Sequence, residues 1–443
     1  MPLFTEQLYA YYQRHPRVIT DSRQPLEGAL FFALRGDRFD GNQFAEEALE
    51  KGAALVVVDD PAVAAVLEEK GGSHVLVDNT LAALQALARH YRRSWRMPVL
   101  AITGSNGKTT TKELIAAVMS QRYTIHATPG NYNNHIGLPL TILQVGPEVE
   151  MCILEMGANH QGEIAALCKI GEPSHGLITN IGQAHLEGFG GREGIKKGKG
   201  ELFDWLGQND GVGFVNQDEE HLPDLGEKLN RKIGFITSAA PHPDVEAMEV
   251  NLLRTHPNCR VGFLSESGEM LEAETKLPGR HNFQNIKAAV AVGKYFKVPG
   301  KLIVKALEDY QSTNSRSQRL KHRGVNFYWD AYNANPTSTK ATLAAFTEMS
   351  DGPRAAILGD MLEMGEESYD LHLEVARFAL DSGVKDLILV GEEYAPVAEQ
   401  LGLTHFDDSV ALRGWFWEHE WDNYLVMVKG SRGIALEKLL EEA

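Results

Sequence analysis

A glycine-rich segment at residues 101–110 has the composition of a phosphate-binding loop. Its letters are Ala-Ile-Thr-Gly-Ser-Asn-Gly-Lys-Thr-Thr. Gly104 and Gly107 let the backbone approach phosphate oxygens closely and turn its amides toward them. Lys108 would bring a positive charge to the β- and γ-phosphates, and the Thr109 hydroxyl is a suitable magnesium ligand. The alternative is an ordinary glycine turn beside a solvated lysine.

Three further side chains suited to cation chemistry lie downstream. Glu155 closes the apolar run 151–156, where a carboxylate could ligate a hard cation, although a surface or helix-capping role is the alternative. His185 stands in a glycine-rich loop, where a lone histidine is more often structural or solvated. Lys199 lies in a basic segment that, by itself, indicates a solvated helix face.

Alternating apolar patterns predict the elements that must position these groups. In the first part, strands are expected at 31–34 and 54–60, and helices at 44–53, 61–72 and 81–95. A strand at 99–103 precedes the glycine-rich loop, and a helix at 109–120 follows it. Further strands are expected at 151–156, 176–181, 211–216, 326–332, 355–360, 386–391 and 424–430. Such alternation favours mostly parallel sheets.

The segment 231–277 is richer in strand signals and contains a predicted hairpin around 266–269. A helix should begin near Asn282. With a boundary near Trp95, the pattern predicts three α/β domains in series, spanning 1–95, 96–313 and 314–443.

Composition excludes several classes of protein. The chain has 443 residues, 43% hydrophobic and 23% charged, with a formal net charge of −17, so we expect no nucleic-acid partner. Its three cysteines indicate thiols in a reducing compartment and no disulfide framework. The sequence shows neither a signal peptide nor a run of about 20 apolar residues, so we expect a cytoplasmic protein without membrane insertion.

The spacing Gly104-x-x-Gly107-Lys-Thr is shorter than the generic phosphate loop and resembles the ATP loop of the Mur ligase superfamily. Further segments similar to that superfamily follow through the chain. They are 20–23 (TDSR), 130–139 (GNYNNHIGLP), 155–163 (EMGANHQGE), 179–182 (TNIG), 184–190 (AHLEGFG), 199–201 (KGE), 279–285 (GRHNFQN), 314–318 (NSRSQ), 330–336 (DAYNANP), 358–368 (LGDMLEMGEES) and 429–432 (KGSR).

The resemblance implies a three-domain Mur ligase architecture. An N-terminal domain would bind a UDP-linked substrate, a central ATPase-like parallel sheet would bind ATP, and a Rossmann-like C-terminal domain would bind the amine substrate and close on ATP. The segments 332–336 and 359–365 resemble the member that ligates D-alanyl-D-alanine to UDP-N-acetylmuramoyl-tripeptide through an acyl phosphate, in peptidoglycan synthesis. A monomer is expected.

The resemblance also implies roles for individual residues. The catalytic residues would be Lys108, Lys199, His185 and Arg316. ATP would contact Gly104, Ser105, Asn106, Gly107, Lys108, Thr109, Thr110, Asn282, Asn285, Arg316 and Asp330. Two magnesium ions would be held by Thr109, Glu155, His185 and Lys199, the last as a carbamylated lysine. Substrates would contact Ser22, Arg23, Asn131, Asn134, His160, Asn333, Asn335 and Lys429.

Several alternatives remain open from the residues. Arg319 could replace Arg316, and Lys196 or Lys197 could replace Lys199. Asn282 could simply be a helix N-cap, and Arg316 and Asp330 could form structural ion pairs. At the level of function, the alternatives are the tripeptide-forming ligase and a folate polyglutamate ligase, against both of which the segment 332–336 argues, and a switch ATPase that hydrolyses nucleotide to drive binding. The third residue of the tripeptide, meso-diaminopimelate or lysine, is not determined by the sequence.

Overall fold

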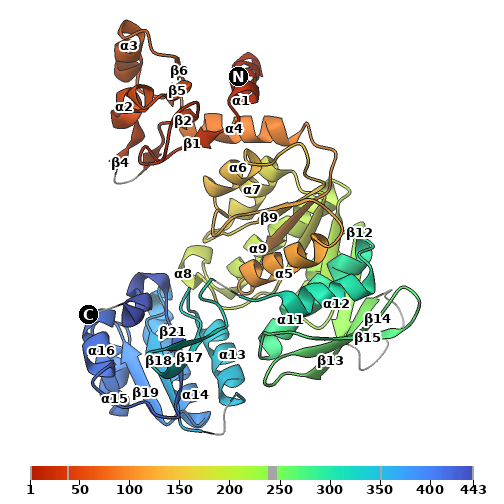
Figure 1. Cartoon of the computed structure of the whole chain (residues 1–443), viewed down its shortest axis with the longest axis vertical. Coiled ribbons are helices and arrows are strands. Elements are labelled where there is room, and N and C mark those ends of the chain that lie inside the picture. The colour runs from red at the N-terminus through yellow and green to blue at the C-terminus, as the bar shows by residue number, and fades with distance from the viewer. Residues whose placement is uncertain (1, 37–38, 238–246, 313, 350–351, 442–443) are drawn as a thin grey trace. The chain divides into compact units, whose positions relative to one another are not determined.

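A computed structural model describes residues 2–36, 39–237, 247–312, 314–349 and 352–441 (Figure 1). The chain divides into two compact units. The first comprises Met1–Ala101, Tyr123–Gly157 and Glu163–His175. The second comprises Ile102–Arg122, Ala158–Gly162 and Gly176–Ala443. The strand β7 (Val99–Thr103) contributes residues to both units.

The first unit contains a parallel sheet of four strands in the order β1-β2-β5-β6. The bounds are β1 (Val18–Ile19), β2 (Leu30–Phe32), β5 (Leu55–Val58) and β6 (His74–Leu76), with helices α1 (Pro2–Arg14), α2 (Ala45–Glu50), α3 (Pro61–Glu69) and α4 (Thr80–Arg92). β3 (Arg35–Gly36) and β4 (Phe39–Asp40) form a small antiparallel pair before the 3-10 helix η1 (Gly41–Phe44). The predicted strands and helices of this region are confirmed.

The remainder of the first unit holds β8 (Ile125–Ala127), β9 (Met151–Glu155), α6 (Gly137–Ile142) and α7 (Glu163–Gly171). β9 lies between β7 and β8. Tyr12 on α1 packs its ring 5.1 Å from that of Tyr91 on α4, and its hydroxyl donates to the carbonyl of Leu143 at 2.8 Å. These contacts fix the N-terminal helix on its unit.

In the second unit, β7 is followed in one sheet by β10, β11, β12, β13, β14 and β15. The bounds are β10 (His175–Ile178), β11 (Val212–Asn216), β12 (Arg231–Thr237), β13 (Ala247–Arg254), β14 (Arg260–Leu264) and β15 (Met270–Glu274). The helices are α5 (Lys108–Met119), α8 (Leu186–Phe189), α9 (Arg192–Gln208), α10 (Leu222–Gly226), α11 (Arg280–Tyr295) and α12 (Gly300–Asp309). The predicted hairpin is confirmed, because β14 and β15 pair antiparallel across a turn at 265–269.

The C-terminal part of the second unit is a six-stranded sheet in the order β16-β17-β21-β18-β19-β20. The bounds are β16 (Gln318–His322), β17 (Val325–Trp329), β18 (Arg354–Gly359), β19 (Asp386–Val390), β20 (Thr404–Phe406) and β21 (Leu425–Lys429), with helices α13 (Pro336–Thr347), α14 (Ser368–Asp381), α15 (Ala395–Leu401), α16 (Ser409–Phe416), η2 (Gly365–Glu367), η3 (Arg432–Ile434) and η4 (Leu436–Leu440). All strands after β17 pair in parallel. The predicted parallel α/β character is therefore confirmed here.

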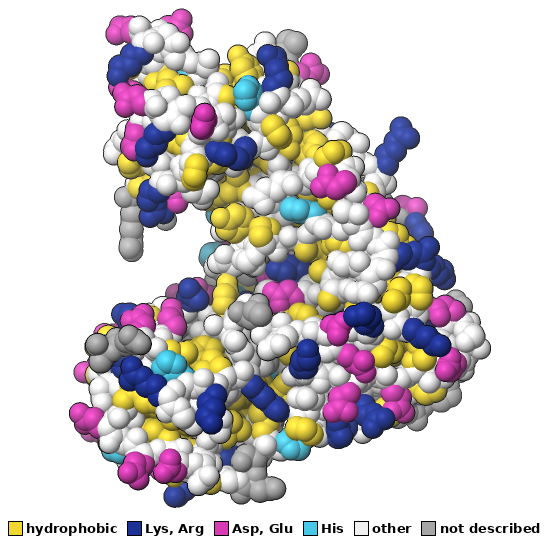
Figure 2. Space-filling model, viewed as in Figure 1, with side chains coloured by type: hydrophobic (Ala, Val, Ile, Leu, Met, Phe, Trp, Pro, Cys, Tyr) yellow, Lys and Arg dark blue, Asp and Glu magenta, His cyan; other side chains and the backbone are white. Residues whose placement is uncertain are grey.

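The surface and helices add two observations. On the face seen in Figure 2, acidic and basic side chains are interspersed, so a polyanion would meet repulsion as well as attraction there. Within the described ranges, no helix has both the length and the apolar content needed to cross a bilayer.

Candidate active site

The glycine-rich loop joins β7 to α5 and has the shape of an anion cradle. Gly107 is the N-cap of α5, with φ 78° and no side-chain cap. A Cβ at Gly104 would lie 2.0 Å from Thr179 Oγ1, and one at Gly107 would lie 2.5 Å from Asn285 Oδ1. Both positions therefore require glycine, and the first-turn amides of α5 remain suited to a phosphate.

Residues after β10 hold this loop in place. The Asn180 side chain accepts from the Asn106 amide at 3.1 Å and donates to its carbonyl at 3.0 Å. Thr179 Oγ1 donates to the same carbonyl at 2.6 Å. Thr179 and Asn180 belong to the segment 179–182 that resembles the superfamily, but no role was predicted for either residue. Their position after a parallel strand was the available signal, because the carboxyl ends of such strands meet at one edge of a sheet.

Lys108 and the threonines begin α5. The Lys108 ammonium donates to the carbonyls of Gly104 at 2.7 Å and Ser105 at 3.3 Å, so it lies over its own loop. Thr109 and Thr110 are 5% and 8% exposed. The predicted loop residues are thus gathered at one helix terminus.

Asn282 and Asn285 share one face of α11, as predicted. Asn285 Nδ2 donates to Asn282 Oδ1 at 3.3 Å, and Asn285 Oδ1 accepts from Thr111 Oγ1 on α5 at 3.0 Å. The alternative that Asn282 is an N-cap is wrong, because α11 begins at Arg280 and its N-cap is Gly279. The pair therefore belongs to the packing of α11 against α5.

Asp330 and Lys429 form a buried ion pair. Asp330 directly follows β17, and Lys429 is the last residue of the neighbouring parallel strand β21. Lys429 Nζ donates to Asp330 Oδ2 at 2.7 Å and to the Asn333 carbonyl at 3.0 Å. Asp330 also accepts from Thr342 Oγ1 at 2.7 Å. Burial raises the pKa of Asp330, but the charge and hydrogen bond of Lys429 outweigh it, so the pKa lies below its ordinary value.

The two candidate arginines differ in their surroundings. The Arg316 guanidinium lies 4.0 Å from the centroid of the Tyr332 ring, and its buried Nε has no hydrogen-bond partner among the described residues. Arg319 Nη2 donates to the Pro257 carbonyl at 2.5 Å from an exposed position. This difference favours Arg316 as the arginine that meets the γ-phosphate, because its Nε has no hydrogen-bond partner among the described residues.

Asn335 links the C-terminal sheet region to the phosphate loop. Its Oδ1 caps α13 by accepting from the Ser338 amide at 2.9 Å, and its Nδ2 donates to Asn106 Oδ1 at 2.7 Å. Asn333 Oδ1 accepts from the Ala334 amide at 2.9 Å. Asn335 therefore lies at the phosphate loop.

His185, the N-cap of α8, lies in the left-handed region with φ 56°. Its Nδ1 hydrogen-bonds the carboxylate of Glu363, and this bond holds the pKa of Glu363 below its ordinary value. Glu363 lies inside the segment 358–368 that resembles the superfamily, but no role was predicted for it.

Lys199 is only 1% exposed, so the solvated-face interpretation is wrong for it. Its Nζ donates to the Ala158 carbonyl at 2.9 Å and lies 4.7 Å from the Phe189 ring centroid. Lys197 is exposed and Lys196 half-buried, so neither matches the burial of Lys199. His160, which is exposed, belongs to the same short segment as Ala158.

Glu155 is a buried residue of the first unit, 1% exposed, so its surface alternative is wrong. Its Oε1 accepts from Asn133 Nδ2 at 2.8 Å. Asn134 accepts from the amides of Ile136 and Gly137 at the start of α6, at 3.1 and 2.9 Å.

The remaining predicted residues of this unit lie near the surface. Asn131 is exposed, and Ser22 offers its carbonyl to Lys51 Nζ at 3.0 Å. Arg23 forms an ion pair with Asp21 at 2.8 Å, and this hydrogen bond lowers the pKa of Asp21 to about 2.

The donor set fits magnesium only in part. In the portion of the chain that the structure describes, no three His, Cys, Asp or Glu side chains are gathered as a metal site. Magnesium needs few protein ligands when phosphates and water supply the rest. The Thr109 hydroxyl at the cradle fits such an ion.

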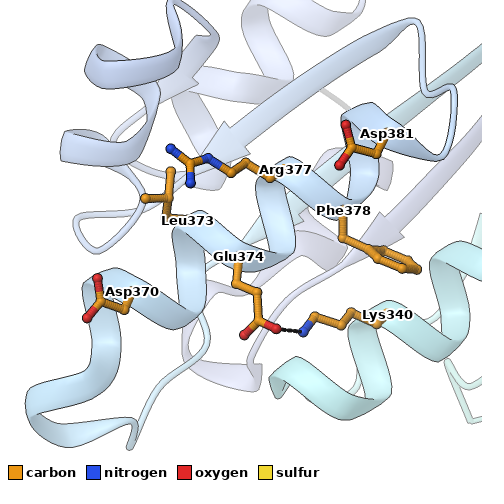
Figure 3. Close-up of a pocket in the computed structure, with 7 residues that line it drawn as sticks. All are labelled: Lys340, Asp370, Leu373, Glu374, Arg377, Phe378 and Asp381. Carbon is orange, nitrogen blue, oxygen red and sulfur yellow. Dashed lines mark hydrogen bonds and ion pairs between the residues drawn. The ribbon is translucent and has the colours of Figure 1, made fainter.

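A separate groove of about 420 Å³ lies on α13 and α14. Figure 3 shows its lining, in which Lys340 pairs with Glu374. None of the predicted site residues lines it.

Comparison with known proteins covers nearly the whole chain. Residues 102–293 match the family described as Mur ligase middle domain, 315–432 the Mur ligase glutamate ligase domain, and 17–92 the Mur ligase family catalytic domain. A Bacillus subtilis UDP-N-acetylmuramoyl-tripeptide–D-alanyl-D-alanine ligase is 34% identical, covering 96% of this chain and 92% of its own. The Escherichia coli ligase of the same name is 33% identical with the same coverage.

Solved structures agree with these relatives. A crystal structure of MurF from Acinetobacter baumannii has a TM-score of 0.84 at 28% identity, covering 98% of this chain and 97% of that one. MurF from Thermotoga maritima in complex with ADP has a TM-score of 0.81 at 26% identity and covers 96% of each chain. By sequence over almost its full length and by fold, the chain belongs to the Mur ligase family, within its MurF group.

Proposed function

We propose that this chain joins D-alanyl-D-alanine to UDP-N-acetylmuramoyl-tripeptide with ATP, forming the pentapeptide precursor of peptidoglycan. The observation that carries the proposal is the phosphate cradle at Gly104 and Gly107, bounded by Asn285 and contacted through Asn106 by Asn335. The relatives that carry this activity in their names match the chain over nearly its whole length. An ADP-bound structure in the same group supports ATP as the phosphoryl donor.

We assign the UDP-linked substrate to residues 1–95, ATP to 96–313 and the dipeptide to 314–443. The three family matches fall within these ranges. One chain carries every proposed residue, so a monomer suffices. Both nucleotide substrates belong to the cytoplasm, where we place the reaction.

The first step joins two anions. A carboxylate oxygen of the tripeptide attacks the γ-phosphorus of ATP, the bond to ADP breaks, and an acyl phosphate forms. Positive charge must offset the repulsion, and Lys108 and Arg316 supply it from two segments of the chain. Asn282 and Asn285 face the adenine, and Asp330 acts on the ribose side.

In the second step the dipeptide amine attacks the acyl carbon. A tetrahedral intermediate collapses, the amide bond forms, and phosphate leaves while the nitrogen loses its proton. Asn333, Asn335 and Lys429 serve the dipeptide, with Lys429 ordering the Asn333 turn. Asn131, Asn134 and His160 line the acyl path, and Ser22 and Arg23 serve the uridine nucleotide.

Thr109 and Glu155 would hold one magnesium ion, and His185 and Lys199 a second. When bound, magnesium neutralises phosphate charge. An ammonium cannot ligate a cation, so Lys199 would serve as a carbamate, formed when its neutral amine adds CO₂ and releases a proton. The Lys199 Nζ is buried and bonded to the Ala158 carbonyl, so the side chain is held in one position, which supports a specific role for it.

A ligation assay with both tripeptide variants, ATP, magnesium and D-alanyl-D-alanine tests the proposal. Phosphate release should require both the acyl and the amine substrate. A reaction without the dipeptide should yield at most the acyl phosphate. Turnover of ATP without either substrate would indicate a switch ATPase and overturn the proposal.

The carbamate has its own test. Lys199→Ala should lose ligation while the chain remains folded. Lys196→Ala, at a half-buried neighbour, should retain ligation. Full ligation by Lys199→Ala would contradict the carbamate assignment.

A further inference from the structure

Glu113, on the phosphate-loop helix α5, holds Tyr310 and Asn314, which lie between α12 and β16. Tyr310 Oη donates to Glu113 Oε2 at 2.7 Å, and Asn314 Nδ2 donates to Glu113 Oε1 at 2.7 Å. Both carboxylate oxygens are thus bonded to one short stretch of chain. Burial and the Glu113 charge raise the pKa of Tyr310, so its hydroxyl keeps its proton and donates.

Two further sets of hydrogen bonds hold the residues around Arg316, one from Ser312 before it and one at Ser317 after it. Ser312 Oγ donates to the Arg316 carbonyl at 2.6 Å. The Ser317 amide donates to Asp330 Oδ1 at 3.1 Å, and Ser317 Oγ accepts from Asn282 Nδ2 at 3.1 Å. Arg316 therefore lies between an anchor on α5 and an anchor shared by α11 and the C-terminal sheet region.

We propose that Glu113 is a positioning residue for ligation, which fixes Arg316 relative to the helix that begins at Lys108. The inference rests on the proposed function, in which Lys108 and Arg316 act on one triphosphate. Glu113 stands on α5 little more than one helical turn after Lys108. Its two bonds therefore transmit the position of the phosphate-loop helix to the segment carrying Arg316.

This role predicts a split between rate and binding. ATP is held by the loop and by Asn282 and Asn285, whereas the two side-chain oxygens of Glu113 accept from Tyr310 and Asn314. Loss of the Glu113 bonds to Tyr310 and Asn314 would displace Arg316. Misplacing a catalytic group by about 1 Å can slow a reaction about 100-fold. We expect kcat to fall about 10- to 100-fold while the Kd for ATP changes less than about threefold.

The test exchanges donor and acceptor in the hydrogen bond between Asn314 and Glu113. Asn314→Asp places a second carboxylate against Glu113, and the repulsion should lower kcat as above. In the double variant Glu113→Gln with Asn314→Asp, the Gln amide can donate to the new carboxylate while its oxygen still accepts from Tyr310. The double variant should regain most of the lost kcat. Asp309→Asn, which alters an exposed carboxylate paired with Lys305, is the matched control and should leave kcat unchanged.

Each outcome decides the proposal. Asn314→Asp with wild-type kcat, or a loss of kcat that the double variant does not restore, would overturn it. A raised Kd for ATP with unchanged kcat would also overturn it, since it would place Glu113 in nucleotide binding. Should Asn314→Asp fail to fold, Tyr310→Phe removes one bond at constant shape and should lower kcat about threefold or more. Absence of ligation in the wild type would instead refute the proposed function.

Discussion

The imidazole Nδ1 of His185 is hydrogen-bonded to the carboxylate of Glu363, although the two residues lie 178 positions apart. Because a carboxylate accepts, Nδ1 carries the proton, and Nε2 is the nitrogen suited to a cation. Glu363 stands in the turn between β18 and α14, where the Met361 amide donates to His372 Nε2 at 2.9 Å and the Leu362 amide to Ser431 Oγ at 3.0 Å. These bonds hold the turn that presents Glu363 to His185.

Removing the Glu363 carboxylate should weaken the use of magnesium. A carboxylate bonded to a histidine orients the ring and increases its basicity, and losing it typically costs about 10- to 100-fold in metal affinity. For Glu363→Ala we expect the magnesium concentration for half-maximal ligation to rise about tenfold. The magnesium-dependent tightening of ADP binding, measured by calorimetry, should shrink in parallel. Glu366→Ala, at an exposed neighbour, is the control, and equal effects in both variants would contradict the assigned pairing.

A side chain at Gly107 should abolish nucleotide binding without unfolding the chain. Its Cβ would lie 2.5 Å from Asn285 Oδ1, which is buried and bonded to Thr111, and φ is 78°. For Gly107→Ala we expect at least a 100-fold weaker Kd for ATP. Gly71→Ala tests backbone strain alone, because φ is 65° there and nothing lies within 4 Å. Comparable ATP binding by the two variants would contradict the cradle.

The phosphate loop was predictable because its chemistry is local. Glycine, lysine and threonine between a strand and a helix identify it without knowledge of distant residues. Glu113 gives no such signal, because it is one of 60 acidic residues and its partner Asn314 lies 201 positions away. Glu363 lies in the segment 358–368 that resembles the superfamily, but its pairing with His185, 178 positions away, depends on tertiary structure. The Asn-Pro order at Asn335 is typical of a helix start. Its bond to Asn106, however, depends on tertiary structure.

The same contrast holds for the elements. Buried strands such as β7 and β18 were predicted because their apolar runs are continuous. β8 and β20 were not predicted, since both are edge strands without a buried residue. Their pairing comes from neighbouring strands and not from their own composition.

The Asp330–Lys429 pair should make stability depend on pH. Asp330→Asn leaves the Lys429 charge buried and unpaired, which destabilises by about 3–5 kcal/mol. Since the folded pKa of Asp330 lies below its unfolded value of about 3.9, its contribution is present above that value and disappears as pH falls through the folded pKa. The difference between wild type and variant in the free energy of unfolding, measured with urea, should therefore be largest at pH 7 and decrease toward pH 3. Asp381→Asn, at an exposed carboxylate, should show no such difference, and a difference constant with pH would contradict the pairing.

A second buried ion pair should respond unequally to loss of its two members. Lys287 on α11 is 0% exposed, and its Nζ donates to Asn216 Oδ1 at 2.8 Å and to the Asp218 carboxylate, which retains 27% exposure. Burial lowers the pKa of Lys287 despite this partner.

Asp218→Asn would leave the ammonium buried without its counter-charge, at a cost of about 3–5 kcal/mol in the free energy of unfolding. Lys287→Met would leave a carboxylate that water can reach and a chain packed near the rings of Phe235 and Phe283, so the loss should stay below about 1.5 kcal/mol. Urea unfolding of both variants measures the difference. Because Lys287 lies on the helix that carries Asn282 and Asn285, Asp218→Asn should also weaken ATP binding, and equal destabilisation by the two variants would contradict this asymmetry.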